Sequence, residues 1–423
     1  MQEKTQQVKT SIMPIVVEQH AEEAAFLWLL RDAAIRAPHY SLKDLAKLDD
    51  RVEAHIDGLR IAGDAGWEIC KEALSLEEPG EVFAAAVLAL ESREPARIEQ
   101  VLSVAEAVPE AVRGLISAFG WVSPSQLQRT VKGLLVSTSS FHRRIGIAAC
   151  AVHRADPKVA LQAAIIDDDP ILQARALRAV GELGCKDLLP ALRQQLRVKE
   201  EVCRFWAAWS AVLLGDRGNG LELLKRVAAS GSIFRERALK LVLRVMDSAS
   251  AREWLKGLMQ HPNRLCYVVV GTGITGDSVY VPWLIKQMEA PPVARVAGEA
   301  FTLITGIDIA HEDLEGERPE GFEAGPTEDP EDKDVALDPD EDLPWPDPKK
   351  IQSWWDANKG RFQVGVRYLA GKLITVQHCQ DVLVSGYQRQ RIAAALELSL
   401  IEPGRVLFEV RAPGWWQQRL LKG

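Results

Sequence analysis

The sequence predicts an all-α protein, an α-solenoid of short helical repeats of about 31 residues. An N-terminal helical cap and a small C-terminal module, mainly helical or α+β, are expected to close it. The first observation is that one pattern recurs at a fixed step along the 423-residue chain. The second is that helix-forming residues dominate between regularly spaced Gly, Asp and Pro turn signals, without sustained strand-like alternation.

The repeat is clearest at one position that returns every 31 residues. This position is occupied by Arg113, Arg144, Arg175, Trp206 and Arg237. The same step relates Asp156 to Asp187 and Gly184 to Gly215. A period in this range, carried by helix–turn–helix units, is the signature of a solenoid. We expect the repeats to cover residues 81–310.

The best-defined unit runs from residue 168 to residue 196. Asp169 is placed to cap a helix that has Pro170 at its first position. Gly184 is expected to end that helix in the left-handed conformation, and Asp187 to begin the second helix. Neither helix is long enough to be stable alone, so each unit must bury its apolar face against neighbouring units.

The regions outside the repeats divide by composition. Residues 1–80 are expected to form the helical cap, with helices over 18–36 and 42–60. Residues 311–348 hold 16 acidic and two basic residues, although the whole chain has a net charge of only −8. This acidic, Pro- and Gly-rich stretch is predicted to be a disordered insert. Residues 349–423 are expected to form the C-terminal module, with helices over 348–358, 375–384 and 387–400 and a strand at 406–410.

The repeated Arg has two interpretations. It can link neighbouring units through charge-assisted hydrogen bonds to helix ends and acidic turns, or it can form a basic ladder for an acidic partner. Trp206 interrupts the ladder beside Phe205 and Trp209. Three large aromatic residues in five positions cannot all face one side of a helix, and an exposed member would be a candidate binding anchor. The candidate partner-binding residues of the repeats are therefore Arg144, Arg175, Trp206, Trp209 and Arg237.

A second group of candidates lies in the C-terminal module. Many hydrogen-bond donors gather at one predicted helix start, and two adjacent tryptophans follow near the end of the chain. The donors can bond carbonyl groups and the acidic insert internally, or they can form a partner site. These candidates are Tyr387, Gln388, Arg389, Arg391, Trp415 and Trp416.

No pattern predicts catalysis, a cofactor or a metal site. Gly271, Gly273 and Gly276 match a dinucleotide-binding G-x-G-x-x-G pattern, but the 31-residue step places them within a repeat. We therefore expect them to allow close helix packing. His55, near Asp49 and Asp57, is interpreted as a hydrogen-bonded histidine of a cap helix rather than a metal ligand. The six cysteines form no C-x-x-C pair, which favours reduced thiols.

Two resemblances add to this interpretation. The repeated pattern, an Arg that follows a helix start and has small residues around it, resembles short HEAT-like repeats of the bilin-lyase type. The sequences at 20–28, 37–40 and 48–60, with Trp354-Trp355, 386–391 and 407–414, resemble an uncharacterised bacterial family of HEAT-repeat proteins. Members of that family are often encoded beside type VI secretion genes for spike proteins and effectors.

The resemblance implies a cytoplasmic, non-catalytic scaffold or adaptor that binds a secretion effector or spike component. An immunity protein that binds a toxin is one alternative. A HEAT-like enzyme acting on nucleic acid, such as a DNA base-excision protein, is another, but the weakly basic repeats do not favour nucleic acid. The first ten residues lack the apolar core of a secretory signal, and no run of 18 apolar residues predicts a membrane span. The oligomeric state stays open.

Overall fold

The computed structural model describes residues 13–261, 263–322, 324–325 and 338–422. Residues 1–12, which include the ten residues analysed for a secretory signal, and residues 326–337 of the acidic segment lie outside the described residues. The chain divides into two compact units. Unit 1 comprises residues 1–35, 43–164 and 411–423, and unit 2 comprises residues 36–42 and 165–410.

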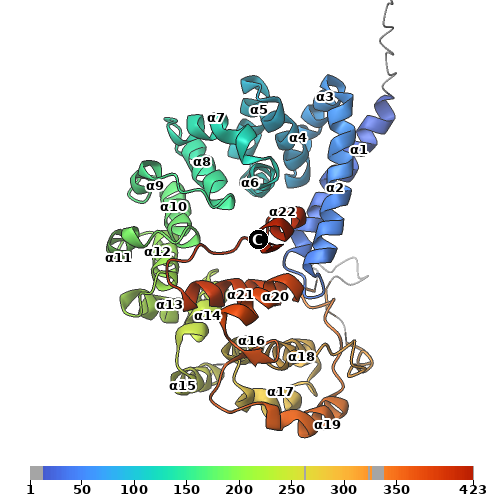
Figure 1. Ribbon diagram of the computed structural model, residues 1–423, viewed down its shortest axis with the longest axis vertical. Coiled ribbons are helices and arrows are strands. Elements are labelled where there is room, and N and C mark those ends of the chain that lie inside the picture. The colour runs from blue at the N-terminus through green and yellow to red at the C-terminus, as the bar shows by residue number, and fades with distance from the viewer. Residues whose placement is uncertain (1–12, 262, 323, 326–337, 423) are drawn as a thin grey trace, which may run out of the picture. The chain divides into compact units, whose positions relative to one another are not determined.

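Unit 1 is built from helices that stack in two rows (Figure 1). Helices α4, α6 and α8 pack successively in one row, α5 and α7 lie beside them, and α1 packs on α4. Trp28 and Phe83 stack in its core, with ring centroids 5.3 Å apart. Its helices are α1 (Pro14–Ala34), α2 (Leu42–Ala62), α3 (Asp64–Ala73), α4 (Pro79–Ser92), α5 (Pro95–Ala107), α6 (Val112–Trp121), α7 (Pro124–Leu135), α8 (Ser140–Val152), α9 (Val159–Ala164) and α22 (Gly414–Lys422).

Unit 2, taken by itself, is also built from paired helices. Its first row consists of α10 (Pro170–Glu182), α12 (Glu201–Leu213), α14 (Arg235–Val245), α16 (Leu265–Thr275) and α18 (Pro291–Thr305). Its second row consists of α11 (Leu189–Gln195), α13 (Asn219–Ala229), α15 (Ser248–Met259) and α17 (Val281–Gln287). Consecutive first-row helices contact one another, as solenoid neighbours do (Figure 1). The predicted all-α solenoid is confirmed.

The C-terminal part of unit 2 folds back onto its first row. It contains α19 (Pro348–Asn358), the two-stranded antiparallel hairpin of β1 (Tyr368–Leu369) and β2 (Lys372–Leu373), α20 (Val376–Ser385) and α21 (Gln388–Ile401). Helices α20 and α21 pack on each other, and α21 contacts α12 and α14 (Figure 1). The chain's own C-terminal helices therefore cover part of the first row.

Local capping follows the sequence closely. The Asp169 carboxylate accepts hydrogen bonds from the backbone N–H groups of Ile171 and Leu172 at the start of α10. Gly184 adopts φ +70° directly after that helix, as predicted. Asp187 lies in a short 3-10 turn, Lys186–Leu188, that leads into α11, so the second helix of the pair begins slightly later than expected.

The helices predicted outside the repeats are confirmed by α1, α2, α19, α20 and α21. The strand predicted at 406–410 is wrong. This stretch is irregular, and the Leu407 N–H donates to the Glu182 carbonyl at the end of α10. A helix end offers no extended ladder with which this short apolar stretch could form a sheet. The two short strands lie at 368–373 instead.

One substitution tests how closely first-row helices approach. A methyl group on Gly114 of α6 would lie 2.0 Å from the Pro79 carbonyl oxygen of α4. We expect Gly114→Ala to destabilise unit 1 by about 1–3 kcal/mol, because backbone must move. The matched change is Gly133→Ala on α7, where an added methyl group would have no other atom within 4 Å. It should stabilise unit 1 by up to about 1 kcal/mol, because alanine favours a helix more than glycine does. Urea denaturation measures both, and equal midpoints for the two variants would contradict the close packing.

Candidate protein-interaction site

The repeated Arg positions in unit 1 take part in internal contacts. Arg113 donates to Asp32 of α1 at 2.7 Å, and its guanidinium lies 5.8 Å from the Trp28 ring centroid. The Arg144 guanidinium lies 5.3 Å from the ring of Phe141 on its own helix. Arg113 thus links two elements of the unit, which is the packing role considered for the ladder.

In unit 2 the repeated position builds a stack of charged and aromatic groups along the first row. Trp206 of α12 lies between two guanidinium groups, with Arg178 of α10 at 4.8 Å and Arg237 of α14 at 5.4 Å from its ring. Arg175 and Arg178 both bind the buried Glu182 carboxylate, at 3.0 and 2.7 Å. Cation–π contacts with the Trp206 ring therefore connect three successive first-row helices, whereas the ion pairs with Glu182 lie within α10.

The aromatic residues around Trp206 are all in the interior. Trp206 and Trp209 are each 8% exposed, and Phe205 is fully buried. Phe234 stacks on Phe205 with centroids 4.3 Å apart. The condition for a binding anchor, an exposed member of this aromatic group, is therefore not met, because the preceding and following helices cover the sides of α12 that would otherwise face solvent. Trp206 and Trp209 are therefore core residues of the stack.

The donors at the start of α21 serve the interior of unit 2. Gln388 and Arg391 are 0% exposed. Arg391 Nε donates to the Leu383 carbonyl, and the Gln388 amide donates to the Val410 carbonyl. The Tyr387 hydroxyl donates to Asp308 at 2.8 Å. Gln388 and Arg391 cannot contact a partner while buried in this way. The prediction that these two residues bind a partner is therefore corrected: they are interior residues of unit 2.

Arg389 joins three separate segments of unit 2. Its side chain donates to the Arg36 carbonyl, to the Pro339 carbonyl and to the Glu299 carboxylate of α18. Asp340 lies 3.6 Å away. Loss of hydration raises the pKa of Glu299, and the Arg389 charge opposes this shift. Of the two interpretations of these donors, the contacts of Arg389 fit the internal one, in which the donors bond carbonyl groups and one end of the acidic segment.

The last two candidates lie in unit 1. Trp415, at the start of α22, packs edge-on against Trp121 with centroids 4.7 Å apart. The Arg419 guanidinium lies 5.7 Å from the neighbouring Trp416 ring. Both tryptophans are half-buried. The structure therefore does not gather the predicted residues into one site: they fall into the first-row stack, the start of α21, and unit 1.

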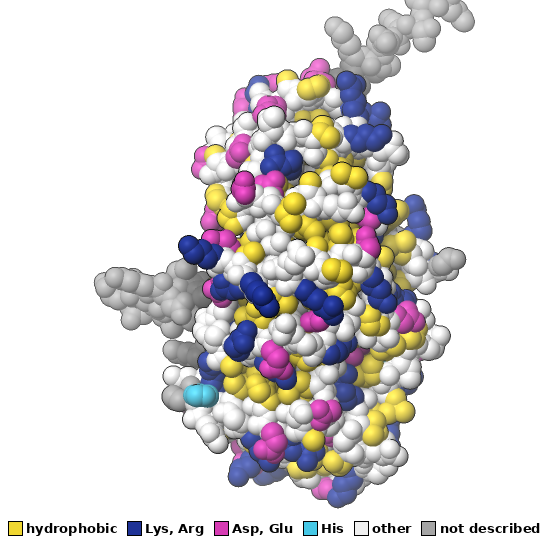
Figure 2. All heavy atoms as spheres, turned by 90° about the vertical axis from the view of Figure 1, so that its left-hand side faces the viewer, with side chains coloured by type: hydrophobic (Ala, Val, Ile, Leu, Met, Phe, Trp, Pro, Cys, Tyr) yellow, Lys and Arg dark blue, Asp and Glu magenta, His cyan; other side chains and the backbone are white. Residues whose placement is uncertain are grey.

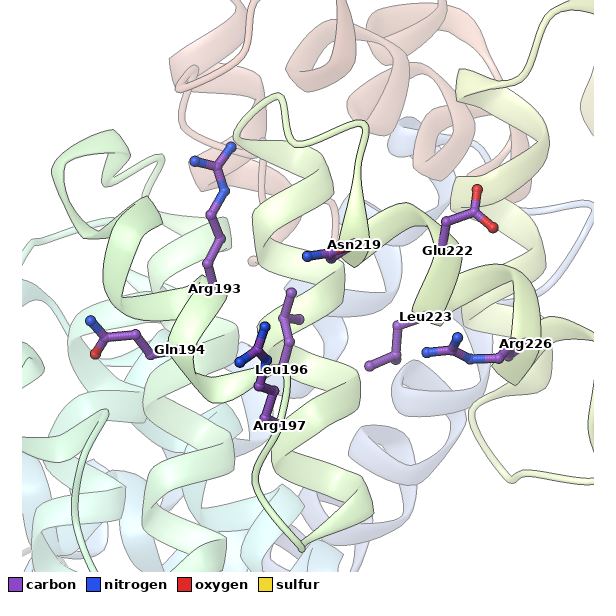
Figure 3. A pocket seen from close by; sticks show the side chains of 8 residues that line it. All are labelled: Arg193, Gln194, Leu196, Arg197, Asn219, Glu222, Leu223 and Arg226. Carbon is purple, nitrogen blue, oxygen red and sulfur yellow. The ribbon is translucent and has the colours of Figure 1, made fainter.

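A hollow in unit 2 lies elsewhere, between the second-row helices α11 and α13 (Figure 3). It has a volume of about 660 Å³. Three arginines, Arg193, Arg197 and Arg226, surround a floor made by Leu196 and Leu223. Gln194, Asn219 and Glu222 complete the lining. We call this hollow, with its eight lining residues, the α11–α13 groove.

Sequence reasoning missed this groove. Its arginines do not share one position of the 31-residue step, and each alone is an ordinary charge on a solvated helix face. The available signal was that two consecutive second-row helices both carry basic residues on their polar faces. Figure 2, which looks onto the second-row side, shows Lys and Arg side chains spaced among hydrophobic ones.

The glycine pattern belongs to a helix. Gly271 and Gly273 lie within α16, and Gly276 ends that helix with φ +69°. A methyl group on Gly273 would lie 2.9 Å from Ala300 of α18, and one on Gly271 would lie 2.8 Å from Leu255. The expected role in close helix packing is confirmed, and the strand that a dinucleotide fold requires is replaced by α16.

Two histidines meet between helices of unit 1. The Nδ1 atoms of His20 and His55 lie 3.2 Å apart between α1 and α2, so His55 is hydrogen-bonded, although only half-buried. Within the described ranges, no group of three His, Cys, Asp or Glu side chains is arranged to hold a metal ion. None of the helices in those ranges is long and apolar enough to cross a membrane.

Comparison with known families gives one match. Residues 157–241, from the turn before α9 into α14, match a family model described as HEAT repeats. No curated protein and no solved structure matches the chain. The matched region includes the unit predicted in most detail and the Trp206 stack. This region is therefore similar to HEAT repeats.

Proposed function

We propose that this chain is a non-catalytic scaffold that binds another protein through the second row of helices in unit 2. The observation that carries the proposal is the packing of α21 on first-row helices α12 and α14. A buried Glu397 on α21 binds Arg244 of α14 at 3.3 Å and Arg367 at 2.5 Å. Because these contacts use first-row surface internally, the second row supplies the exposed surface on which a solenoid can hold a partner.

The resemblance to a family encoded beside type VI secretion genes makes the proposal more specific. The partner would be an effector or a spike component, and the chain would act in the bacterial cytoplasm as an accessory factor that presents one to the other. HEAT repeats support binding to protein in general, and the effector or spike partner rests on the resemblance alone.

The test is co-purification of the tagged full-length chain from a bacterium that encodes it, with mass spectrometry of the retained proteins. The proposal expects an effector or spike component at a stoichiometric ratio. An adaptor should leave the activity of a bound effector unchanged, whereas an immunity protein should abolish it at a one-to-one ratio. Recovery of the chain alone, with purified effector and spike protein also failing to bind, would contradict the scaffold.

A further inference from the structure

We infer that the α11–α13 groove binds an acidic peptide segment that carries aliphatic side chains, contributed by the partner protein. The inference rests on the proposed scaffold function, and it names the surface and the chemistry of what the scaffold holds.

The charge of the groove is available to a ligand. Arg197 and Arg226 are exposed, and neither forms an ion pair with a residue in the described part of the chain. In Figure 3 their side chains approach the floor from opposite sides, with Leu223 between them. Two guanidinium groups in this arrangement fit carboxylates on either side of one peptide, and each can bind a carboxylate through two hydrogen bonds.

The other charges around the groove leave this positive character intact. Arg193 contacts Asp216 through Nε and Nη2, at 3.1 and 2.9 Å, yet 56% of its side chain remains exposed. Glu222 is the acidic residue of the lining, and its carboxylate binds Lys225 at 2.8 Å. Arg193 therefore adds a third cation, itself paired with Asp216, and the three arginines of the lining outnumber its single carboxylate.

The floor adds an apolar requirement. Leu196 and Leu223 close the groove beneath the arginines. A volume of about 660 Å³ falls within the range of specific ligand sites and accepts several side chains. An aliphatic side chain of the ligand would cover the two leucines, and the exposed Asn219 amide can hydrogen-bond a peptide backbone.

Nucleic acid fits this lining less well. No aromatic ring is present among the eight lining residues on which a base could stack. A carboxylate, Glu222, is present, and the whole chain carries a net charge of −8. A polyanion with many phosphates would meet this negative background, whereas a short acidic peptide engages only the local arginines.

The test is fluorescence anisotropy of the full-length chain with a short fluorescein-labelled peptide of aspartate, glutamate and two leucines. We expect the double variant Arg197→Glu/Arg226→Glu to bind about tenfold more weakly than the unmodified chain, because two attractions become repulsions. Arg129→Glu, on the exposed face of α7, is a control for charge reversal outside the groove and should bind as the unmodified chain does. Neither Arg197 nor Arg226 pairs with a described residue, so thermal melting of the double variant should be unchanged.

Two further peptides separate the charge from the apolar contribution. Replacing the acidic residues with their amides should abolish the dependence on Arg197 and Arg226, and replacing the leucines with serine should weaken binding to all variants. Equal affinity of the double variant and the Arg129→Glu control for the acidic peptide would overturn the inference. So would a DNA oligonucleotide that binds more tightly than the peptide and displaces it.

Co-purification of the native partner with each variant distinguishes failure of the groove inference from failure of the scaffold proposal. Loss of an effector or spike protein from the double variant, but not from Arg129→Glu, supports both. Equal retention by both variants overturns the groove and leaves the scaffold standing. Arginine-dependent peptide binding without retention of any effector or spike protein supports the groove and overturns the proposed function.

Discussion

Replacing Glu397 with alanine is expected to destabilise unit 2 by about 3–5 kcal/mol. The carboxylate is buried between Arg244 and Arg367, and the Arg244 side chain is itself only 5% exposed. Burial lowers the pKa of Arg244 to about 10, and the charge of Glu397 opposes that shift. Without the carboxylate, Arg244 would remain buried with no opposing charge beside it, which is the costly half of a broken buried pair.

The control is on the same helix and changes the same residue type. Glu402 caps α21 and binds Arg405 at 2.8 Å, but this pair is exposed, so Glu402→Ala should change stability by less than about 1 kcal/mol. The double variant Glu397→Ala/Arg244→Met should recover part of the loss, because it removes the unpaired charge. Urea denaturation followed by hydrogen exchange in α14 and α21 measures these changes. A double variant as unstable as the sum of its parts would show that the pair is not the source of the effect.

The same variant bears on where a partner binds. If α21 loosens from α14, the first row becomes accessible while the α11–α13 groove, on the second row, keeps its lining. Binding of the acidic peptide should then survive Glu397→Ala at temperatures where unit 2 remains folded. This result would show that the first-row face, which α21 covers, is distinct from the second-row face proposed to bind a partner.

The repeat architecture was predictable because it depends on local signals that recur. Asp169 and Pro170 fix the start of α10, Gly184 fixes its end, and the 31-residue step repeats the arrangement independently of any single residue. Short helices that are unstable alone must then stack, so the fold follows from the period. The helices at 348–358 and 376–385 carry similar caps in Asp347 and Thr375.

The candidate site was not predictable in the same way. Whether Trp206 is exposed depends on what lies beside α12, and whether Arg391 is buried depends on how α21 packs on the repeats. These are contacts between residues distant in the sequence, and a charged or aromatic residue gives the same local signal in either environment. The strand predicted at 406–410 failed for the same reason, because a strand requires a neighbour that the local pattern does not specify.

The second large effect is expected from Trp206→Ala, which should cost unit 2 about 3–5 kcal/mol. Its ring is 8% exposed and lies between the guanidinium groups of Arg178 and Arg237, so its removal leaves a cavity across three repeats. Trp206→Phe keeps a ring between the two cations and should cost less. Urea denaturation gives the magnitudes, and hydrogen exchange should locate the loosening in α10, α12 and α14.

This prediction distinguishes a core residue from a binding anchor. An anchor at an interface would lose partner affinity on truncation while leaving the stability of the isolated chain unchanged. Trp206 should do the reverse: stability falls, and peptide binding at the α11–α13 groove declines only as unit 2 unfolds. The groove variant Arg197→Glu/Arg226→Glu is expected to show the opposite pattern, with peptide binding weakened about tenfold at unchanged stability. Loss of peptide affinity in Trp206→Ala at unchanged stability would indicate that Trp206 belongs to the binding surface. It would contradict the role of Trp206 as a core residue that joins the stacked repeats.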